Sequence, residues 1–156
     1  MKLLLLSFGK PHEPYVQMGV EDFTRRIGRY YPVAWQILPP PKNAASLSVT
    51  DYKKKEAETV LAKLEKDDYL VCLDERGKML NSEQLAQLVA ARGNESVKRL
   101  VFLIGGAYGI DAEVLQKARF TWSLSALVFP HQLVRLILAE QVYRACTILA
   151  NEKYHH

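Results

Sequence analysis

The sequence is poor in residues that hold metals or disulfide frameworks. Its 156 residues include two cysteines, Cys72 and Cys146, and four histidines, at positions 12, 131, 155 and 156. Both cysteines lie in apolar runs, so we expect buried, unpaired thiols and a cytoplasmic location. The histidines are too scattered to form a ligand cluster with these cysteines. We therefore expect no metal site.

Long apolar runs and the common nucleotide-binding loops are also missing. No stretch approaches 18 uncharged apolar residues, so we expect no membrane span. The apolar start, residues 3–8, is too short for a signal peptide and fits a buried strand better. There is no G-x-x-x-x-G-K-[ST] loop, and Ile104 before Gly105 rules out a G-x-G-x-x-G fingerprint there. Ser123 and Ser125 lack a G-x-S-x-G nucleophile elbow.

The charge balance is mildly basic. Lys and Arg number 21 against 17 Asp and Glu, a net charge of +4. This excess suits an anionic partner such as RNA, but many soluble enzymes share it, so charge alone identifies no partner.

Buried strands alternate with helices along the chain. Because these strands are apolar without alternation, we expect a mainly parallel sheet with helices on both faces, in one domain spanning residues 1–156. The expected strands are residues 3–8, 33–38, 69–73, 99–104 and 120–124. Helices are expected from about Pro14, from Thr50 or Asp51, from Asn81 or Ser82 to about Arg92, and after Asp111, with a turn at 74–78.

The last expected helix, from His131 to about Ala150, is apolar around most of its circumference. Such a helix must be buried on more than one side. A second subunit would provide the additional cover in so small a protein, and a central core position is the alternative.

Two segments have the composition of ligand-binding loops. The Gly105–Gly109 turn follows a strand and precedes a capped helix, and its glycines permit close backbone approach. The stretch Ser123–His131 contains apolar residues and small hydroxyls with no acidic or basic residue before its histidine, a surface suited to an adenine. Ordinary structural corners are the alternative for both segments.

Four residues near the C-terminus are candidates for chemistry. His131 and Arg135 share one helical face. His131 could accept a proton near neutral pH, or simply cap the helix. Arg135 could hold a phosphate or a developing anion. Tyr154 and His155 belong either to a disordered tail or to a tail that closes over a neighbouring site.

The C-terminal motifs resemble the RlmH (YbeA-type) family, the ribosomal RNA large subunit methyltransferases H of the SPOUT class. The resemblance lies in Ile104–Gly109, in Ser123–Arg135, in Glu140–Ala145 and in the final Tyr154-His155, and it extends more loosely to the whole chain. It implies a deep C-terminal trefoil knot, which departs from the rule that chains avoid threading loops.

The resemblance also implies a cofactor, a substrate and a homodimer. S-adenosylmethionine would bind in the knot, and the substrate would be a pseudouridine in helix 69 of 23S rRNA, methylated at N3 on the assembled ribosome. His131, Arg135, Tyr154 and His155 would be the catalytic residues, with either histidine as the base. By position, the cofactor would contact Leu73, Gly105, Leu124, Ser125, Ala126, Leu127, Val128 and Phe129.

Two other functions compete with this interpretation. One is a non-catalytic RNA-binding or ribosome-assembly factor with the same fold. The other is a SPOUT enzyme that methylates a ribose 2′-hydroxyl, although the Asn-x-x-Arg type of motif of such relatives is missing.

Overall fold

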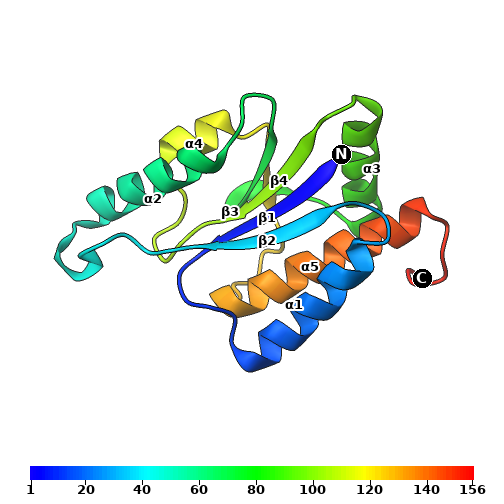
Figure 1. Ribbon diagram of the computed structural model, residues 1–156, viewed down its shortest axis with the longest axis horizontal. Coiled ribbons are helices and arrows are strands. Elements are labelled where there is room, and N and C mark those ends of the chain that lie inside the picture. The colour runs from blue at the N-terminus through cyan, green and yellow to red at the C-terminus, as the bar shows by residue number, and fades with distance from the viewer.

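All 156 residues are described by the computed structural model, in which five parallel strands lie between two layers of helices (Figure 1). The expected α/β class is confirmed. The sheet order is β2-β1-β4-β3-β5. The strands are β1 (Lys2–Phe8), β2 (Val33–Leu38), β3 (Tyr69–Met79), β4 (Arg99–Ile104) and β5 (Phe120–Ser123). The helices are α1 (Pro14–Ile27), α2 (Val49–Lys63), α3 (Ser82–Asn94), α4 (Ala112–Lys117) and α5 (His131–Leu149), with a 3-10 turn, η1, at Ala44–Ser46.

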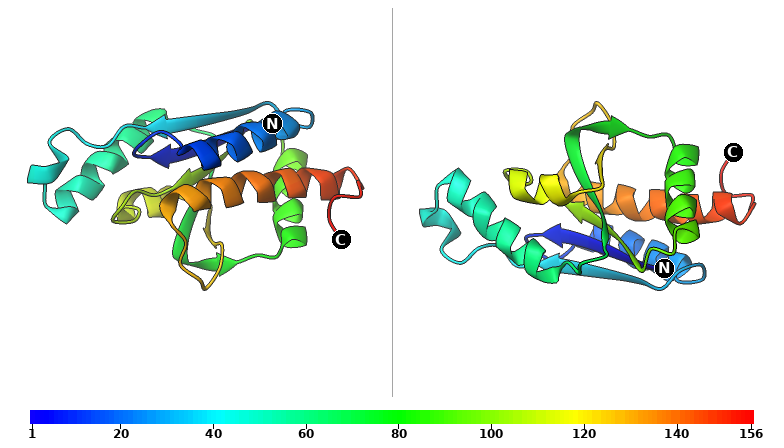
Figure 2. Two further views of the ribbon diagram at one scale, coloured as in Figure 1. Left: turned by 90° about the horizontal axis from the view of Figure 1, so that it is seen from below. Right: turned by 90° about the horizontal axis from the view of Figure 1, so that it is seen from above.

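The strands are apolar on both faces because each face carries a layer of helices. In β1, Leu3 and Leu5 belong to the core beneath α1, α3 and α5, whereas Leu4 and Leu6 belong to the core beneath α2 and α4. Figure 2 shows the two layers on opposite sides of the sheet. This double burial accounts for the continuous apolar runs of the sequence.

Side-chain caps mark the starts of α2, α3 and α4. Asn81 forms a capping box with Gln84 at the start of α3, and the Asp111 carboxylate accepts a hydrogen bond from the Glu113 N–H at the start of α4. The expected start of α2 is wrong by a few residues. Ser48 is its cap, and the Ser48 hydroxyl accepts from the Asp51 N–H, which places Asp51 inside the first turn.

The expected turn at residues 74–78 is wrong, because β3 continues through it to Met79. The pairing of β3 with β5 shifts register between Leu73 and Lys78, so the intervening residues form a bulge. Gly77 makes this possible: a Cβ atom there would lie 2.5 Å from the Thr121 carbonyl oxygen. Only glycine permits so close a backbone approach.

Helix α5 packs between α1 and α3 on one face of the sheet (Figure 2). This central position by itself buries Leu138, Ala139, Val142 and Ala145. The core alternative therefore explains most of the apolar circumference of α5, and the dimer stays a prediction, as does the knot. None of the helices has the length and apolar character needed to span a membrane.

Candidate functional site

A pocket of about 580 Å³ opens where β3, β4 and β5 reach the segments that follow them. The helix after β3 lies on the α5 face of the sheet, whereas the helix after the neighbouring strand β4 lies on the α2 face. Connections that leave adjacent parallel strands toward opposite faces create a crevice beyond their carboxyl ends, where α/β proteins commonly bind ligands. The topology therefore favours a ligand site at this place.

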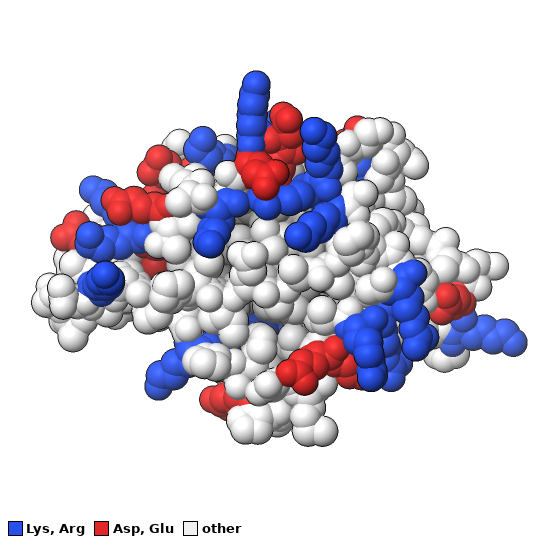
Figure 3. Space-filling view, viewed as in Figure 1, with Lys and Arg blue, Asp and Glu red and all other residues white.

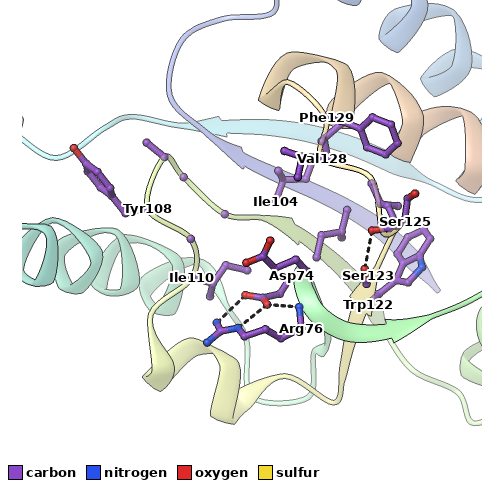
Figure 4. A pocket seen from close by; sticks show the side chains of 18 of the residues that line it. Asp74, Arg76, Ile104, Tyr108, Ile110, Trp122, Ser123, Ser125, Val128 and Phe129 are labelled. Carbon is purple, nitrogen blue, oxygen red and sulfur yellow. Dashed lines mark hydrogen bonds and ion pairs between the residues drawn. The ribbon is translucent and has the colours of Figure 1, made fainter.

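The two segments that have the composition of ligand-binding loops, the Gly105–Gly109 turn and the stretch from Ser123, line this one pocket (Figure 4). Of the eight residues expected to contact a cofactor, Ala126 alone does not line it. The seven that do are Leu73, Gly105, Leu124, Ser125, Leu127, Val128 and Phe129. A volume of this size and a mixed, mainly apolar lining are typical of small-molecule sites.

The loop between β5 and α5 is shaped by its own serines. The Ser125 hydroxyl accepts a hydrogen bond from the Leu127 N–H at 3.0 Å, and the Ser123 hydroxyl donates to the Ser125 carbonyl at 3.2 Å. These bonds turn the loop so that Leu127 and Val128 are 71% and 90% exposed. Exposed apolar side chains at a pocket mouth mark a surface that a ligand or partner would cover.

The glycine corner, Gly105–Gly109, forms another wall of the pocket. Gly109 has φ +86°, and its N–H donates to the Gly106 carbonyl at 3.1 Å, which closes the turn. Tyr108 is about half exposed on the corner and lies edge-on to Tyr52, with ring centroids 5.1 Å apart. The corner thus presents backbone to the pocket and an aromatic ring at its rim.

A charged wall comes from the β3 bulge, at residues whose composition predicted a turn. The Arg76 guanidinium and main-chain N–H both donate to the Asp74 carboxylate at 2.9 Å. This interaction lowers the pKa of Asp74. Asp74, Glu75 and Arg76 line the pocket, together with Lys53 from α2. The bulge in Glu75-Arg76-Gly77 depends on tertiary pairing with β5, so no local signal identified these residues.

The Trp122 indole forms part of the pocket wall from within the core. Trp122 lines the pocket, is 3% exposed, and its Nε1–H has no hydrogen-bond partner. The Nε1 atom itself is buried in the core beside Phe102, so the indole contributes its ring rather than its N–H to the pocket wall.

His131 and Arg135 lie at the start of α5 but outside the pocket lining. Arg135 is fully buried, and its guanidinium donates to the Phe8 carbonyl at 2.8 Å and to the Lys10 carbonyl at 2.9 Å. Burial and the nearby Arg135 charge lower the pKa of His131, which favours a neutral imidazole. Arg135 therefore anchors the loop after β1, a role that differs from the expected contact with a phosphate or a developing anion.

Tyr154 and His155 fold back against the C-terminal half of α5 and do not form a loose tail. The Tyr154 hydroxyl donates to the Glu140 carboxylate at 3.1 Å. The His155 Nε2 lies 2.8 Å from the Glu83 carboxylate on α3, and its Nδ1 lies 3.2 Å from the Arg144 guanidinium. Within one chain the four candidate catalytic residues form two separate pairs.

No group of three or more His, Cys, Asp or Glu side chains is arranged to hold a metal ion.

Comparison with known proteins identifies relatives along the whole chain. Residues 1–155 match the family model described as "Predicted SPOUT methyltransferase". The protein named ribosomal RNA large subunit methyltransferase H from Trichlorobacter lovleyi is 42% identical, with both chains covered completely. The protein of the same name from Flavobacterium johnsoniae is 41% identical, covering 100% of this chain and 99% of the relative.

Solved structures share the fold at low sequence identity. A probable methyltransferase from Bordetella pertussis superimposes with a TM-score of 0.56 at 12% identity, covering 92% of this chain and 93% of that one. A probable methylase family protein from Haemophilus influenzae gives 0.53 at 13% identity, covering 99% and 70%. With the family match over nearly every residue, the chain belongs to the SPOUT methyltransferases, in the ribosomal RNA large subunit methyltransferase H family.

Proposed function

We propose that this protein, as a homodimer, transfers a methyl group from S-adenosylmethionine to N3 of a pseudouridine in helix 69 of 23S rRNA. The observation that carries the proposal is the pocket between the glycine corner and the Leu124–Phe129 loop, in a chain of this family. The names of its relatives support ribosomal RNA as the substrate class.

The pocket fits the cofactor in size and in chemistry. Apolar side chains and backbone groups of the Leu124–Phe129 loop suit the adenine. Asp74 and Glu75 provide carboxylates near a ligand that carries positive charge. When bound, S-adenosylmethionine supplies an electrophilic methyl group on a sulfonium, so positioning accounts for much of the catalysis.

The remaining task for the protein is to remove the N3 proton and stabilise the resulting anion. The neutral imidazole that burial favours at His131 can accept a proton, but its ring lies outside the pocket lining. His155 is already placed between Glu83 and Arg144. We propose that one of the two histidines is the base, that Tyr154 orients the substrate, and that Arg135 supports the charge from within the fold.

Two copies of the chain are required to bring these groups together. The tail folds back onto α5 at Glu140 and Arg144, which lie 9 and 13 residues after His131, or roughly 14 and 20 Å along the helix at about 1.5 Å per residue. A two-fold partner with α5 running in the opposite direction would bring its Tyr154 and His155 toward this pocket. Tyr15 and Met18 on α1, 57% and 77% exposed, offer an apolar surface beside α5 for that contact.

Positive charge lies in separate groups on the face of the molecule seen in Figure 3. Figure 3 shows Lys and Arg side chains gathered near the end of α1, where Arg25 and Arg26 lie, and along the opposite edge of the same face. Asp22 pairs with both arginines, so this group is partly neutralised. We propose that the ribosome is recognised through several such small basic groups, which together can contact phosphates.

Methyl transfer to ribosomes tests the proposed function directly. Purified protein is incubated with labelled S-adenosylmethionine and ribosomes from a strain that lacks this activity. We expect label in 23S rRNA, and after digestion mass spectrometry should identify N3-methylpseudouridine. RNA binding without label would favour the non-catalytic assembly factor, and a 2′-O-methylated product would assign the enzyme to ribose methylation.

Mixed dimers test whether the site is shared between copies. One chain carries Gly105→Val in the pocket, and the other carries Tyr154→Ala and His155→Ala in the tail. Each variant alone should be inactive, whereas the mixed dimer keeps one intact pocket facing one intact tail, and about half of the wild-type rate is expected. An inactive mixed dimer would place pocket and tail functions in the same chain.

A further inference from the structure

The glycine corner separates the main pocket from a second, much smaller cavity. Gly105, Gly106 and Gly109 line both spaces. The second cavity has a volume of about 10 Å³, about that of one water-sized sphere. Its other walls come from β1, β4, α4 and α2, and the α2 wall includes the Glu56 carboxyl. The glycine corner is therefore a thin wall between the two spaces, and α2 packs behind it on the side of the small cavity.

Glu56 occupies the space behind this wall. It is 4% exposed, and its Oε2 has no hydrogen-bond partner. A Cβ atom added at Gly106 would lie 2.2 Å from Oε2 and 2.5 Å from Oε1 of Glu56. Both carboxyl oxygens thus press against the Gly106 backbone where any other residue would have its side chain.

The surroundings of Glu56 favour its neutral form. No Lys, Arg or His lies within ion-pair distance of it, and a buried carboxylate without a cation or N–H donor is costly. Burial raises the pKa of Glu56 to about 7.

Few ionisable groups face this carboxyl. Tyr52 and Lys53 lie one turn earlier on α2, and Asp111 lies across the small cavity at the start of α4. The contacts from β1 and β4 are the apolar Phe8 and Leu103. Glu56 is therefore the group at this wall whose charge changes near neutral pH.

We propose that Glu56 is a positioning residue for the cofactor pocket: its buried, protonated carboxyl supports Gly106 from behind and holds the glycine corner in the shape that binds S-adenosylmethionine. The inference rests on the proposed function, because it concerns the affinity for that cofactor. When Glu56 ionises, the carboxylate gains by moving toward water, and the corner loses its support. The cofactor affinity of the wild type then falls as the pH rises through 7.

Calorimetric titration with S-adenosylmethionine from pH 6 to pH 8.5 tests the inference, using wild type, Glu56→Gln, Glu56→Ala and the control Glu58→Gln. Glu58 is an exposed carboxylate on the same helix. Glutamine has nearly the shape of the neutral acid, so its variant should bind as well as the wild type at pH 6. At pH 8.5 it should bind about tenfold more tightly than the wild type. Glu56→Ala, which removes the support, should bind about tenfold more weakly than the wild type at pH 6.

The ratio of variant to wild-type affinity is the decisive quantity, because the cofactor's own amino group also titrates in this range. Glu58→Gln should keep this ratio at one throughout. A Glu56→Gln ratio that is the same at pH 6 and pH 8.5 would overturn the inference, even if the melting temperature of the variant depended on pH. Wild-type protein that binds no cofactor at any pH would instead contradict the proposed function.

Discussion

Gly105→Val is expected to weaken S-adenosylmethionine binding by more than about 100-fold, equivalent to roughly 2.8 kcal/mol. A Cβ atom at Gly105 would lie 2.5 Å from Cγ1 of Ile110 and 3.3 Å from the Gly109 carbonyl carbon. Ile110 and the corner must move to admit it, and both line the pocket. Overpacking of this kind distorts a wall whose shape the ligand requires.

Calorimetric titration of the purified variant measures this loss, and Gly93→Val is its matched control. A Cβ atom at Gly93, on α3, meets no atom within 4 Å, so valine there should leave cofactor affinity unchanged. Thermal melting shows whether each variant is folded. A folded Gly105→Val protein that binds the cofactor within threefold of the wild type would place the ligand away from the glycine corner.

The fold was largely predictable because its strands are buried on both faces. Strands such as Leu3–Phe8 and Leu100–Ile104 are apolar without alternation, and this pattern is typical of a parallel sheet covered by helices. The β3 bulge was not predictable. Asp-Glu-Arg-Gly has the composition of a turn, and only pairing with β5, which Gly77 permits, extends the strand through it.

The part of the site that is formed by two continuous loop segments was predictable. Gly105 and the Leu124–Phe129 loop stand out in composition, and the structure places them around one pocket. Asp74 and Arg76 come from the bulge and were missed with it. Glu56 was not identified as a site residue, because the sequence does not reveal that its side of α2 lies against Gly106.

The role of Arg135 shows a further limit of sequence reasoning. An arginine after a histidine in a candidate ligand-binding region suggests an anion site, and the side chain was expected to contact a phosphate or an anionic base. Its complete burial and its bonds to the carbonyls of Phe8 and Lys10 depend on the path of the loop after β1, far away in sequence.

Arg135→Ala is therefore expected to destabilise the fold by about 3 kcal/mol or more, because the Phe8 and Lys10 carbonyls lose their donor and a cavity remains. For a protein of this size, the melting temperature should fall by about 6–12 °C. Arg135→Lys should recover less than half of the loss, since one ammonium does not reproduce the guanidinium fork that reaches both carbonyls.

Thermal and urea unfolding measure these changes, with Arg29→Ala, an exposed arginine just after α1, as the control that should melt within about 1 °C of the wild type. The same variants separate the anchoring role from direct contact with the substrate. If Arg135→Ala melted like the wild type and bound S-adenosylmethionine normally but no longer methylated ribosomes, the guanidinium would have to leave its carbonyl partners to reach RNA. The bonds from Arg135 to the Phe8 and Lys10 carbonyls would then belong only to the protein without bound RNA.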